Sequence, residues 1–360
     1  MKRMSYRPGV VRRVLIPKGD GGESKRPLGV SNFEDKIVQG MTDRILKAIY
    51  EPLFLDCSYG FRPGLGCHDA IRSLHHHLYR KRVETVIDID LENFFGTLDH
   101  DLLLEMLREK ISDKRFIRYL SRHLKAGVLS DGDLMMSEEG VPQGSLVSPV
   151  LANIFAHHVI DEWFEDVVKH HCAGEVALFR YCDDAVICCE YAKDAERIKR
   201  ALTCRLSKYK LRLNEDKTQL VSFSKRGYRR GEKQQSFDFL GFTFYWGRAR
   251  EGYPLVKVKT SGKRIRAKLT RINQWCRKVR CRYRLPEIWR MFCMKLQGHM
   301  AYYGVTFNSR HVQTFIHKAT FILYKWLIRR SQRSSLDWEK FSRYRDANPL
   351  PKVRVIHKLY

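Results

Sequence analysis

Two aspartates stand side by side in the middle of the chain and constrain what it can fold into. Asp183 and Asp184 lie between Tyr181-Cys182 and the apolar run Ala185-Val186-Ile187. This pattern predicts a strand, a turn and a second strand, with both carboxylates at the tip of the turn. Neighbouring carboxylates repel each other unless a cation lies between them. The pair therefore indicates either a metal-holding site, as a polymerase needs, or a solvated turn, in which aspartate is common.

A second acidic strand lies earlier in the chain. Val86, Ile87 and Ile89 predict a buried strand, and its period of two places Asp88 and Asp90 on one face. If this strand lies beside the hairpin, Asp90, Asp183 and Asp184 converge as three carboxylates. Such oxygen-rich ligation suits Mg²⁺. Two ions roughly 3.5–4 Å apart can activate an attacking 3′ oxygen and stabilise a leaving pyrophosphate.

Charge and composition limit the function classes. Lys and Arg total 67 against 40 Asp and Glu, which gives +27, and aromatic residues make up 12%. This surplus indicates a polyanionic partner; a basic ribosome-associated or membrane-surface protein is the alternative. No apolar run is long enough to span a bilayer and the N-terminal residues contain no apolar h-region of a signal peptide, so we expect a cytoplasmic protein without a membrane partner. Ten cysteines lack CxxC spacing and are expected to be reduced thiols.

The pattern of apolar residues predicts the order of the elements and one boundary. A non-helical loop at 140–145 precedes a long helix beginning at Pro149. After Val256 the composition shifts to a dense basic run, 259–284, followed by three amphipathic helical stretches that end near Arg330, so we place a domain boundary near Pro254. Strands are expected at 10–17, 84–91 and 237–246, and helices at 34–50, 69–79, 101–110, 149–168 and 194–208.

Several sequence blocks resemble those of reverse transcriptases, in the same order. These are Asp90-Leu91-Glu92-Asn93-Phe94-Phe95, Gly140 to Ile154, and Tyr181-Cys182-Asp183-Asp184. The finer resemblance is to group II intron-encoded reverse transcriptases and maturases, and it covers nearly the whole chain. It rests on Lys25 to Val30 with Glu34 to Gln39, Tyr59 to Gly64, Leu213 to Thr218, Phe239 to Phe242, Trp338 to Phe341 and Pro349 to Lys352.

This resemblance implies an α+β right-hand polymerase fold, with fingers, a palm built on an antiparallel sheet, and an α-helical thumb. It implies fingers in residues 1–85, palm with the remaining fingers segments in 86–250, the thumb or maturase region in 256–345, and a tail in 346–360. The implied activity is RNA-directed DNA synthesis, which extends a primer 3′-hydroxyl with dNTPs. The implied partners are an RNA template, a DNA primer and structured group II intron RNA, and the implied cofactors are two Mg²⁺ ions, with Mn²⁺ as an alternative.

The resemblance also implies roles for individual residues. The metal-binding catalytic acids are Asp90, Asp183 and Asp184. The residues that contact the incoming dNTP are Lys18, Arg26, Phe95, Gln143, Gly144 and Lys217. The nucleic-acid contacts are Arg62, Lys263, Arg264, Arg266, Lys268 and Arg271. Phe95 matches the ring that excludes a 2′-hydroxyl, with core packing as its alternative; Lys217 is as consistent with a solvated surface, and Arg62 with a structural role.

The chain departs from the family pattern in several places. Gly96 stands where the family has a second Asp, and Cys182 replaces the common Ala. The chain begins almost at the fingers, and no Cys/His-rich endonuclease module follows the thumb, so we expect a bacterial type without an endonuclease domain. Two alternatives stay open: a free-standing defence-type or domesticated reverse transcriptase, and a non-catalytic maturase remnant that only binds RNA.

Overall fold

The computed structural model describes residues 5–17, 25–130, 133–135, 139–141, 144–330 and 336–360. Its internal contacts divide the chain into two compact units, with the division between Leu240 and Gly241. This division lies before the boundary expected near Pro254. The reason is a hairpin: β10 (Phe242–Arg248) pairs with β11 (Pro254–Thr260) from Phe242 opposite Thr260 to Arg248 opposite Pro254. A boundary at Pro254 would separate two strands that share a ladder of hydrogen bonds.

The first unit begins with a four-stranded sheet next to a long helix. The strand order is β2-β1-β4-β5, with β1 antiparallel to β2 and parallel to β4. These strands are β1 (Val11–Pro17), β2 (Lys25–Val30), β4 (Val128–Ser130) and β5 (Asp133–Met135). Helix α1 (Phe33–Tyr50) follows β2, capped by the Asn32 side chain on the Asp35 amide. The strand expected at 10–17 and the helix expected at 34–50 are confirmed.

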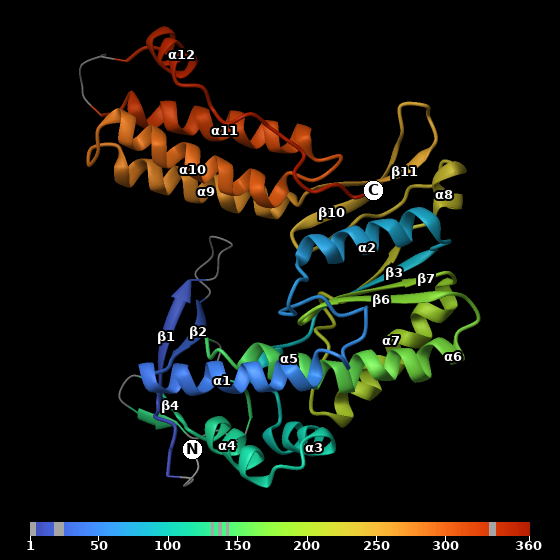
Figure 1. The fold of residues 1–360 in the computed structure, drawn as a ribbon. Helices are drawn as coiled ribbons and strands as arrows, with labels where there is room; N and C mark the ends of the chain where they lie inside the picture. The colour runs from blue at the N-terminus through green and yellow to red at the C-terminus, as the bar shows by residue number, and fades with distance from the viewer. Residues whose placement is uncertain (1–4, 18–24, 131–132, 136–138, 142–143, 331–335) are drawn as a thin grey trace. The chain divides into compact units, whose positions relative to one another are not determined.

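A second sheet in the first unit carries the acidic strands. Its order is β6-β7-β3-β8, and β3 is central, antiparallel to both β7 and β8. The strands are β3 (Thr85–Ile89), β6 (Val176–Tyr181), β7 (Asp184–Cys189) and β8 (Gln219–Ser222). Helix α2 (Cys67–Arg80) lies on one side of this sheet and α7 (Ala192–Lys208) on the other (Figure 1). Because both faces are covered, β3 and β7 are apolar almost throughout, apart from Thr85 and the acids.

The remaining elements of the first unit surround this sheet. They are a 3₁₀ turn at Phe94–Gly96, α3 (His100–Lys110), α4 (Lys114–Leu124), α5 (Ser148–Ala156), α6 (Lys169–His171), α8 (Lys225–Arg229) and β9 (Phe237–Phe239). The helix expected at 149–168 begins as predicted. After Ala156, however, it continues through wider π turns at His157–Asp161 and Phe164–Val168. Such π turns are rare and frequently occur at functional sites.

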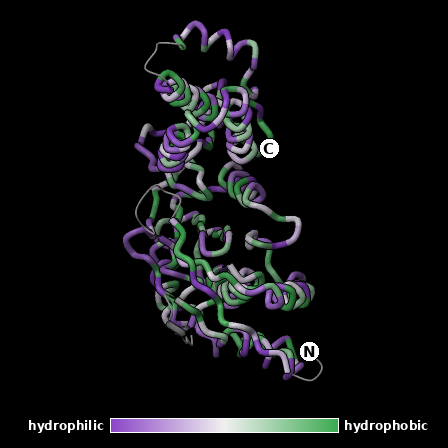
Figure 2. The backbone as a smooth tube through the Cα atoms, turned by 90° about the vertical axis from the view of Figure 1, so that its left-hand side faces the viewer, coloured by the Kyte–Doolittle hydropathy of each residue, from purple (hydrophilic) through white to green (hydrophobic). Residues whose placement is uncertain are grey.

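The second unit consists of the β10–β11 hairpin and four helices. The helices are α9 (Gly262–Val279), α10 (Leu285–Tyr303), α11 (Ser309–Leu327) and α12 (Trp338–Ala347). The expectation of three helical stretches between Arg284 and Arg330 is wrong, because α10 and α11 are each 19 residues long and fill that span. Hydrophobic and hydrophilic residues alternate along these helices (Figure 2), and the buried ones include Phe292, Leu296 and Phe315. Within the described residues, no helix is both long and apolar enough to cross a membrane.

Candidate active site

The acids of the second sheet lie at one end of two neighbouring strands. In the β3–β7 register Ile89 lies opposite Ala185, so Asp90 follows β3 at the level where β7 begins with Asp184. Tyr181 pairs with Asp184, which leaves Cys182 and Asp183 as a two-residue turn between β6 and β7. The strand–turn–strand expected around Asp183 is therefore confirmed, and the register brings the acids of β3 and of the hairpin to the same edge.

The segment after α7 fixes the end of β3 where Asp90 lies. The Asn214 amide donates to the Asp90 carbonyl at 2.9 Å, and the Asp90 amide donates to the Thr218 hydroxyl at 3.3 Å. The same segment carries Lys217, whose Nζ is 3.3 Å from Asp90 Oδ2 and whose side chain is 64% exposed. The main chain of Asp90 is thus held by hydrogen bonds, and its carboxylate faces a solvent-exposed cation.

Negative charge accumulates at this edge. Burial raises the pKa of Asp183, and the charge of Asp90 raises it further against the opposing charge of Arg180. Burial also raises the pKa of Asp88 to about 7, with contributions from Asp184, Asp238 and Asp90. Each shift reports that an ionised carboxylate is disfavoured where it stands. A bound cation would remove this penalty.

The donors at this edge fit a hard divalent cation because they are carboxylate oxygens. As the side chains stand, no group of three or more His, Cys, Asp or Glu among the described residues is arranged to hold a metal ion. The Lys217 ammonium takes the position beside Asp90 Oδ2 instead. The residues present therefore fit a divalent ion by chemistry and by charge, and the ammonium would have to move for an ion to bind.

Phe95 lies in the 3₁₀ turn directly after the acidic strand. Its ring is half-buried against Phe94, at 5.7 Å between ring centroids, and its carbonyl accepts a hydrogen bond of 2.8 Å from the Val141 amide. A Cβ on Gly96 would collide with the side chain of Asn93, which adopts a left-handed conformation at φ 43°. A larger residue at position 96, where the family has an acid, would therefore require the Asn93 side chain to move.

The loop predicted to lie beside the incoming nucleotide approaches β2 closely. Gly144 has φ +111°, and a Cβ there would lie 2.6 Å from the Gly29 carbonyl oxygen, so only glycine fits this position without strain. Arg26 lies in β2 opposite Ile16. Lys18 and Gln143 lie outside the described residues.

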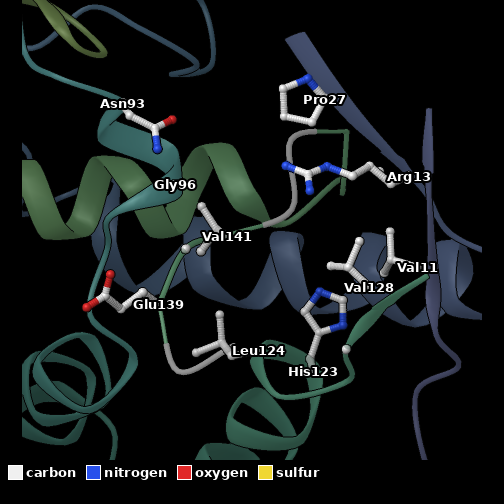
Figure 3. A pocket seen from close by; sticks show the side chains of 13 residues that line it. Val11, Arg13, Pro27, Asn93, Gly96, His123, Leu124, Val128, Glu139 and Val141 are labelled. Carbon is white, nitrogen blue, oxygen red and sulfur yellow. The ribbon is translucent and has the colours of Figure 1, made fainter. Parts of the chain in front are cut away.

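Between the first sheet and this loop lies a cavity of about 270 Å³ (Figure 3). Arg13, Pro27 and His123 line it from one side, and Asn93 and Glu139 from the other. Gly96, which follows Phe95 in the chain, and Gly29, whose carbonyl lies against Gly144, also border the cavity. It offers a cationic side chain, amide and carboxylate groups and apolar walls, a mixture suited to a polar ligand with a flat apolar part.

Arg62 is held by the protein itself. Its Nε is 2.8 Å from Glu51 Oε1, its Nη1 donates to the carbonyls of Leu55 and Ser58, and its side chain is 10% exposed. These bonds leave the guanidinium little freedom to reach a template. The geometry favours the structural alternative for Arg62.

The predicted nucleic-acid contacts on α9 do not share one environment. Lys263, Arg264, Arg266 and Arg271 are exposed. Lys268 turns inward: its Nζ is 3.4 Å from His299 Nδ1 and 4.6 Å from the centre of the Tyr303 ring. Burial, together with the charges of Arg271 and Arg264, lowers the pKa of Lys268 to about 8.

The sequence-based prediction does not include Asp88 or Arg180, both of which the structure places beside the acids. Asp88 could have been predicted from the sequence, because its spacing of two residues from Asp90 places both acids on one face of the strand. Arg180 had a weaker one: it is a charged residue within the apolar run 176–181, and arginine is almost never fully buried unless it is paired. Its partner Asp161 lies in the π turn and carries no sequence signal of its own.

Comparison with known proteins identifies the family. Residues 16–244 match the family described as reverse transcriptase (RNA-dependent DNA polymerase). The chain belongs to this family. It is 33% identical to Protein YkfC of Escherichia coli over 69% of this chain and 70% of that protein. It is 36% identical to the group II intron-encoded protein LtrA of Lactococcus lactis over 44% of this chain and 26% of that protein.

Two further comparisons extend this result. A protein encoded in the cob intron of Schizosaccharomyces pombe is 42% identical over 46% of this chain and 20% of its own length. The chain thus spans only a minor part of the intron-encoded relatives. Telomerase from Candida albicans has the same fold, with a TM-score of 0.53 at 12% identity, over 93% of this chain and 61% of that one. The right-hand polymerase fold and the group II intron type of the reverse transcriptase are therefore confirmed.

Proposed function

We propose that this chain is an RNA-directed DNA polymerase that extends a primer 3′-hydroxyl with dNTPs on an RNA template. One observation carries the proposal: the β3–β7 register brings Asp90 to the level of Asp183 and Asp184, where the charge of Asp90 raises the pKa of Asp183. Polymerases of this family use divalent metal ions, and we assign Mg²⁺, with Mn²⁺ as an alternative, because all the donors are carboxylate oxygens. When bound, two such ions activate the 3′ oxygen and neutralise the leaving pyrophosphate.

The chain's own residues then have separate tasks in this proposal. Asp90 at the end of β3, Asp183 in the β6–β7 turn and Asp184 at the start of β7 would supply the oxygen ligands. Lys217, which is exposed and lies beside Asp90, would face the polyanionic pyrophosphate once its ammonium no longer pairs with Asp90. Phe95 excludes a ribose 2′-hydroxyl. Gly144 allows the main chain to approach the nucleotide, with Lys18, Arg26 and Gln143 as its further contacts.

The test is primer extension by an Asp183→Asn variant. We expect extension to be abolished while RNA affinity stays within about twofold, because affinity comes mainly from phosphates bound by Lys and Arg. The matched control is Asp166→Asn, which neutralises an exposed aspartate in the π-helical segment. Extension at the unaltered rate by Asp183→Asn would refute the assignment of the active site. RNA binding without extension by the unaltered protein would instead favour the non-catalytic maturase.

We also propose that the exposed basic face of α9 binds structured RNA of the group II intron type, in the bacterial cytoplasm. What supports it is the set Lys263, Arg264, Arg266 and Arg271, all exposed on one helix, and the similarity to an intron-encoded protein. Neutralising Lys263, Arg264 and Arg266 should reduce the slope of log affinity against log salt by roughly 0.7–0.9 for each lost phosphate contact. The control neutralises Lys193, Arg200 and Lys208, which are exposed on α7. An unchanged slope in the α9 variant would contradict RNA binding by this face.

A further inference from the structure

The turn that carries Asp183 rests on a fully buried arginine. Arg180 is 0% exposed, and its guanidinium makes two hydrogen bonds to Asp161, Nε to Oδ1 at 2.6 Å and Nη2 to Oδ2 at 2.5 Å. Asp161 is also 0% exposed and closes the π turn 157–161. A buried ion pair that only stabilised a fold could be replaced by apolar residues of similar volume. The other bonds of Arg180 suggest a different reason for its presence.

The donors that Asp161 leaves available reach three further segments. Nη1 donates to the Cys182 carbonyl at 3.1 Å and to Asn153 Oδ1 at 3.2 Å, and Nη2 donates to the Ser58 hydroxyl at 2.8 Å. Ser58 belongs to the loop after α1, Asn153 to α5 and Cys182 to the turn. One planar group therefore ties the turn to a loop and to a helix at fixed angles.

The main chain around Arg180 reinforces this connection. The Arg180 amide donates to the Cys57 carbonyl at 2.8 Å, and the Tyr59 amide donates to the Arg180 carbonyl at 2.9 Å. The Asn153 side chain donates to the Gly60 carbonyl. Cys182 itself adopts a left-handed conformation at φ 60°, which is uncommon outside glycine. Such a conformation persists only where the surroundings fix it, and the bond from Arg180 to the Cys182 carbonyl lies directly at this residue.

We propose that Arg180, oriented by Asp161, is a positioning residue that holds the Cys182–Asp183 turn in its left-handed form and so sets where the Asp183 carboxylate lies. The proposal rests on the proposed polymerase function, because it concerns the same site. Arg180 is held by Asp161 and acts on the site through the turn; its charge, which also lowers the pKa of Asp183, is retained in an Arg180→Lys variant. Its removal should therefore alter the chemical step and leave nucleotide and RNA binding nearly unchanged.

The experiment replaces the pair by apolar residues, Arg180→Met with Asp161→Leu, in the full chain. A displacement of the carboxylates by about 1 Å should reduce kcat by about 100-fold, while the KM for dNTP and the RNA affinity change by less than about threefold. Arg205→Met is the matched control. Arg205 donates to the carbonyls of His158 and Val159 in the same π segment at 3.2 Å each, but has no bond to the turn. The Arg205→Met variant should therefore have the same kcat as the unaltered protein.

A second variant and a second measurement keep the inference testable if the pair substitution does not fold. Arg180→Lys keeps the cation beside Asp161, but a single ammonium cannot reproduce the fork that reaches Cys182 and Ser58, so kcat should again decrease. Amide hydrogen exchange at Cys182 and Asp183 should become at least about tenfold faster in both Arg180 variants and stay unchanged in Arg205→Met. A folded variant with unaltered kcat and unaltered exchange would overturn the inference.

These results separate the inference from the proposed function. If the unaltered protein extends no primer, the proposed function is wrong, and hydrogen exchange alone decides whether Arg180 holds the turn. If the unaltered protein extends primers and the Arg180 variants extend them equally well, the inference is wrong and the proposed function stands.

Discussion

Gly60→Ala adds one methyl group under the turn that holds Asp183. An ideal Cβ at position 60 would lie 2.5 Å from Cys182 Sγ and 2.7 Å from the Cys182 amide nitrogen, whereas ordinary contacts begin at 3.4 Å. The overlaps are therefore 3.4 − 2.5 = 0.9 Å and 3.4 − 2.7 = 0.7 Å. The φ of Gly60 is not in the left-handed region, so alanine is compatible with the backbone there, and the collision with Cys182 is the main effect.

The overlap can be relieved in two ways, and each has a measurable consequence. If the turn stays in place, the strain costs about 1–3 kcal/mol of unfolding free energy, as overpacking of a core usually does. If the turn moves by the 0.7–0.9 Å of the overlap, the carboxylate of Asp183 moves with it, and the rate should decrease by about 100-fold. We expect the second outcome to contribute most, because the Cys182 amide nitrogen is main chain and cannot rotate away.

The assay is primer extension on an RNA template, read together with urea unfolding. Cys182→Ala combined with Gly60→Ala is the diagnostic variant, since it removes the sulfur and leaves the amide contact at 2.7 Å. It should recover only part of the lost rate, while Cys182→Ala alone should stay active. Gly60→Ala with unaltered rate and stability would show that the turn is not packed against Gly60, and would refute the reasoning.

Three further predictions concern other parts of the chain. Gly298→Ala in α10 should raise the unfolding free energy by about 0.5–1 kcal/mol, measured in urea, because the glycine is exposed with nothing within 4 Å of an added Cβ; a destabilised variant would contradict this. Phe95→Val should lower the ratio of dNTP to rNTP incorporation, because the ring is removed while the hydrogen bond from Val141 to its carbonyl is retained; an unchanged ratio in an active variant would assign Phe95 to packing. Lys268→Met should stabilise the second unit below pH 8, since the folded-state pKa of about 8 lies below the unfolded value of 10.5. The stability tied to Lys268 is thus present above pH 10.5 and lost as the pH decreases through 8. The shift is discounted for the partial exposure of Lys268 and for its favourable contact with the Tyr303 ring, so the unfolding free energy of Lys268→Met should exceed that of the unaltered protein by about 1–2 kcal/mol at pH 7. Equal melting temperatures of Lys268→Met and the unaltered protein from pH 7 to 10 would contradict this prediction.

The sequence alone was enough to predict the acidic edge of the second sheet. Alternation along residues 85–90 identifies a buried strand with acids on one face, and apolar runs on both sides of Asp183 predict a tight hairpin. Both patterns are local, because the alternation of apolar residues and the residue types of a turn can each be recognised within about ten residues. The order of the reverse transcriptase blocks supplied the fold, and the match over residues 16–244 confirms the family.

The tertiary structure decided which partners the charged residues have. Arg62, Arg180 and Lys268 look alike as basic residues in the sequence, yet the first two are bound inside the first unit and the third turns onto His299. A side chain's partner depends on segments that are far away in the chain: Arg180 meets Ser58 across 122 residues, and Lys268 meets His299 across 31. Local patterns encode which face of an element is buried. Which buried charge meets which partner is set only when the elements pack, because desolvation favours whichever hydrogen-bonded pairing the packed elements allow.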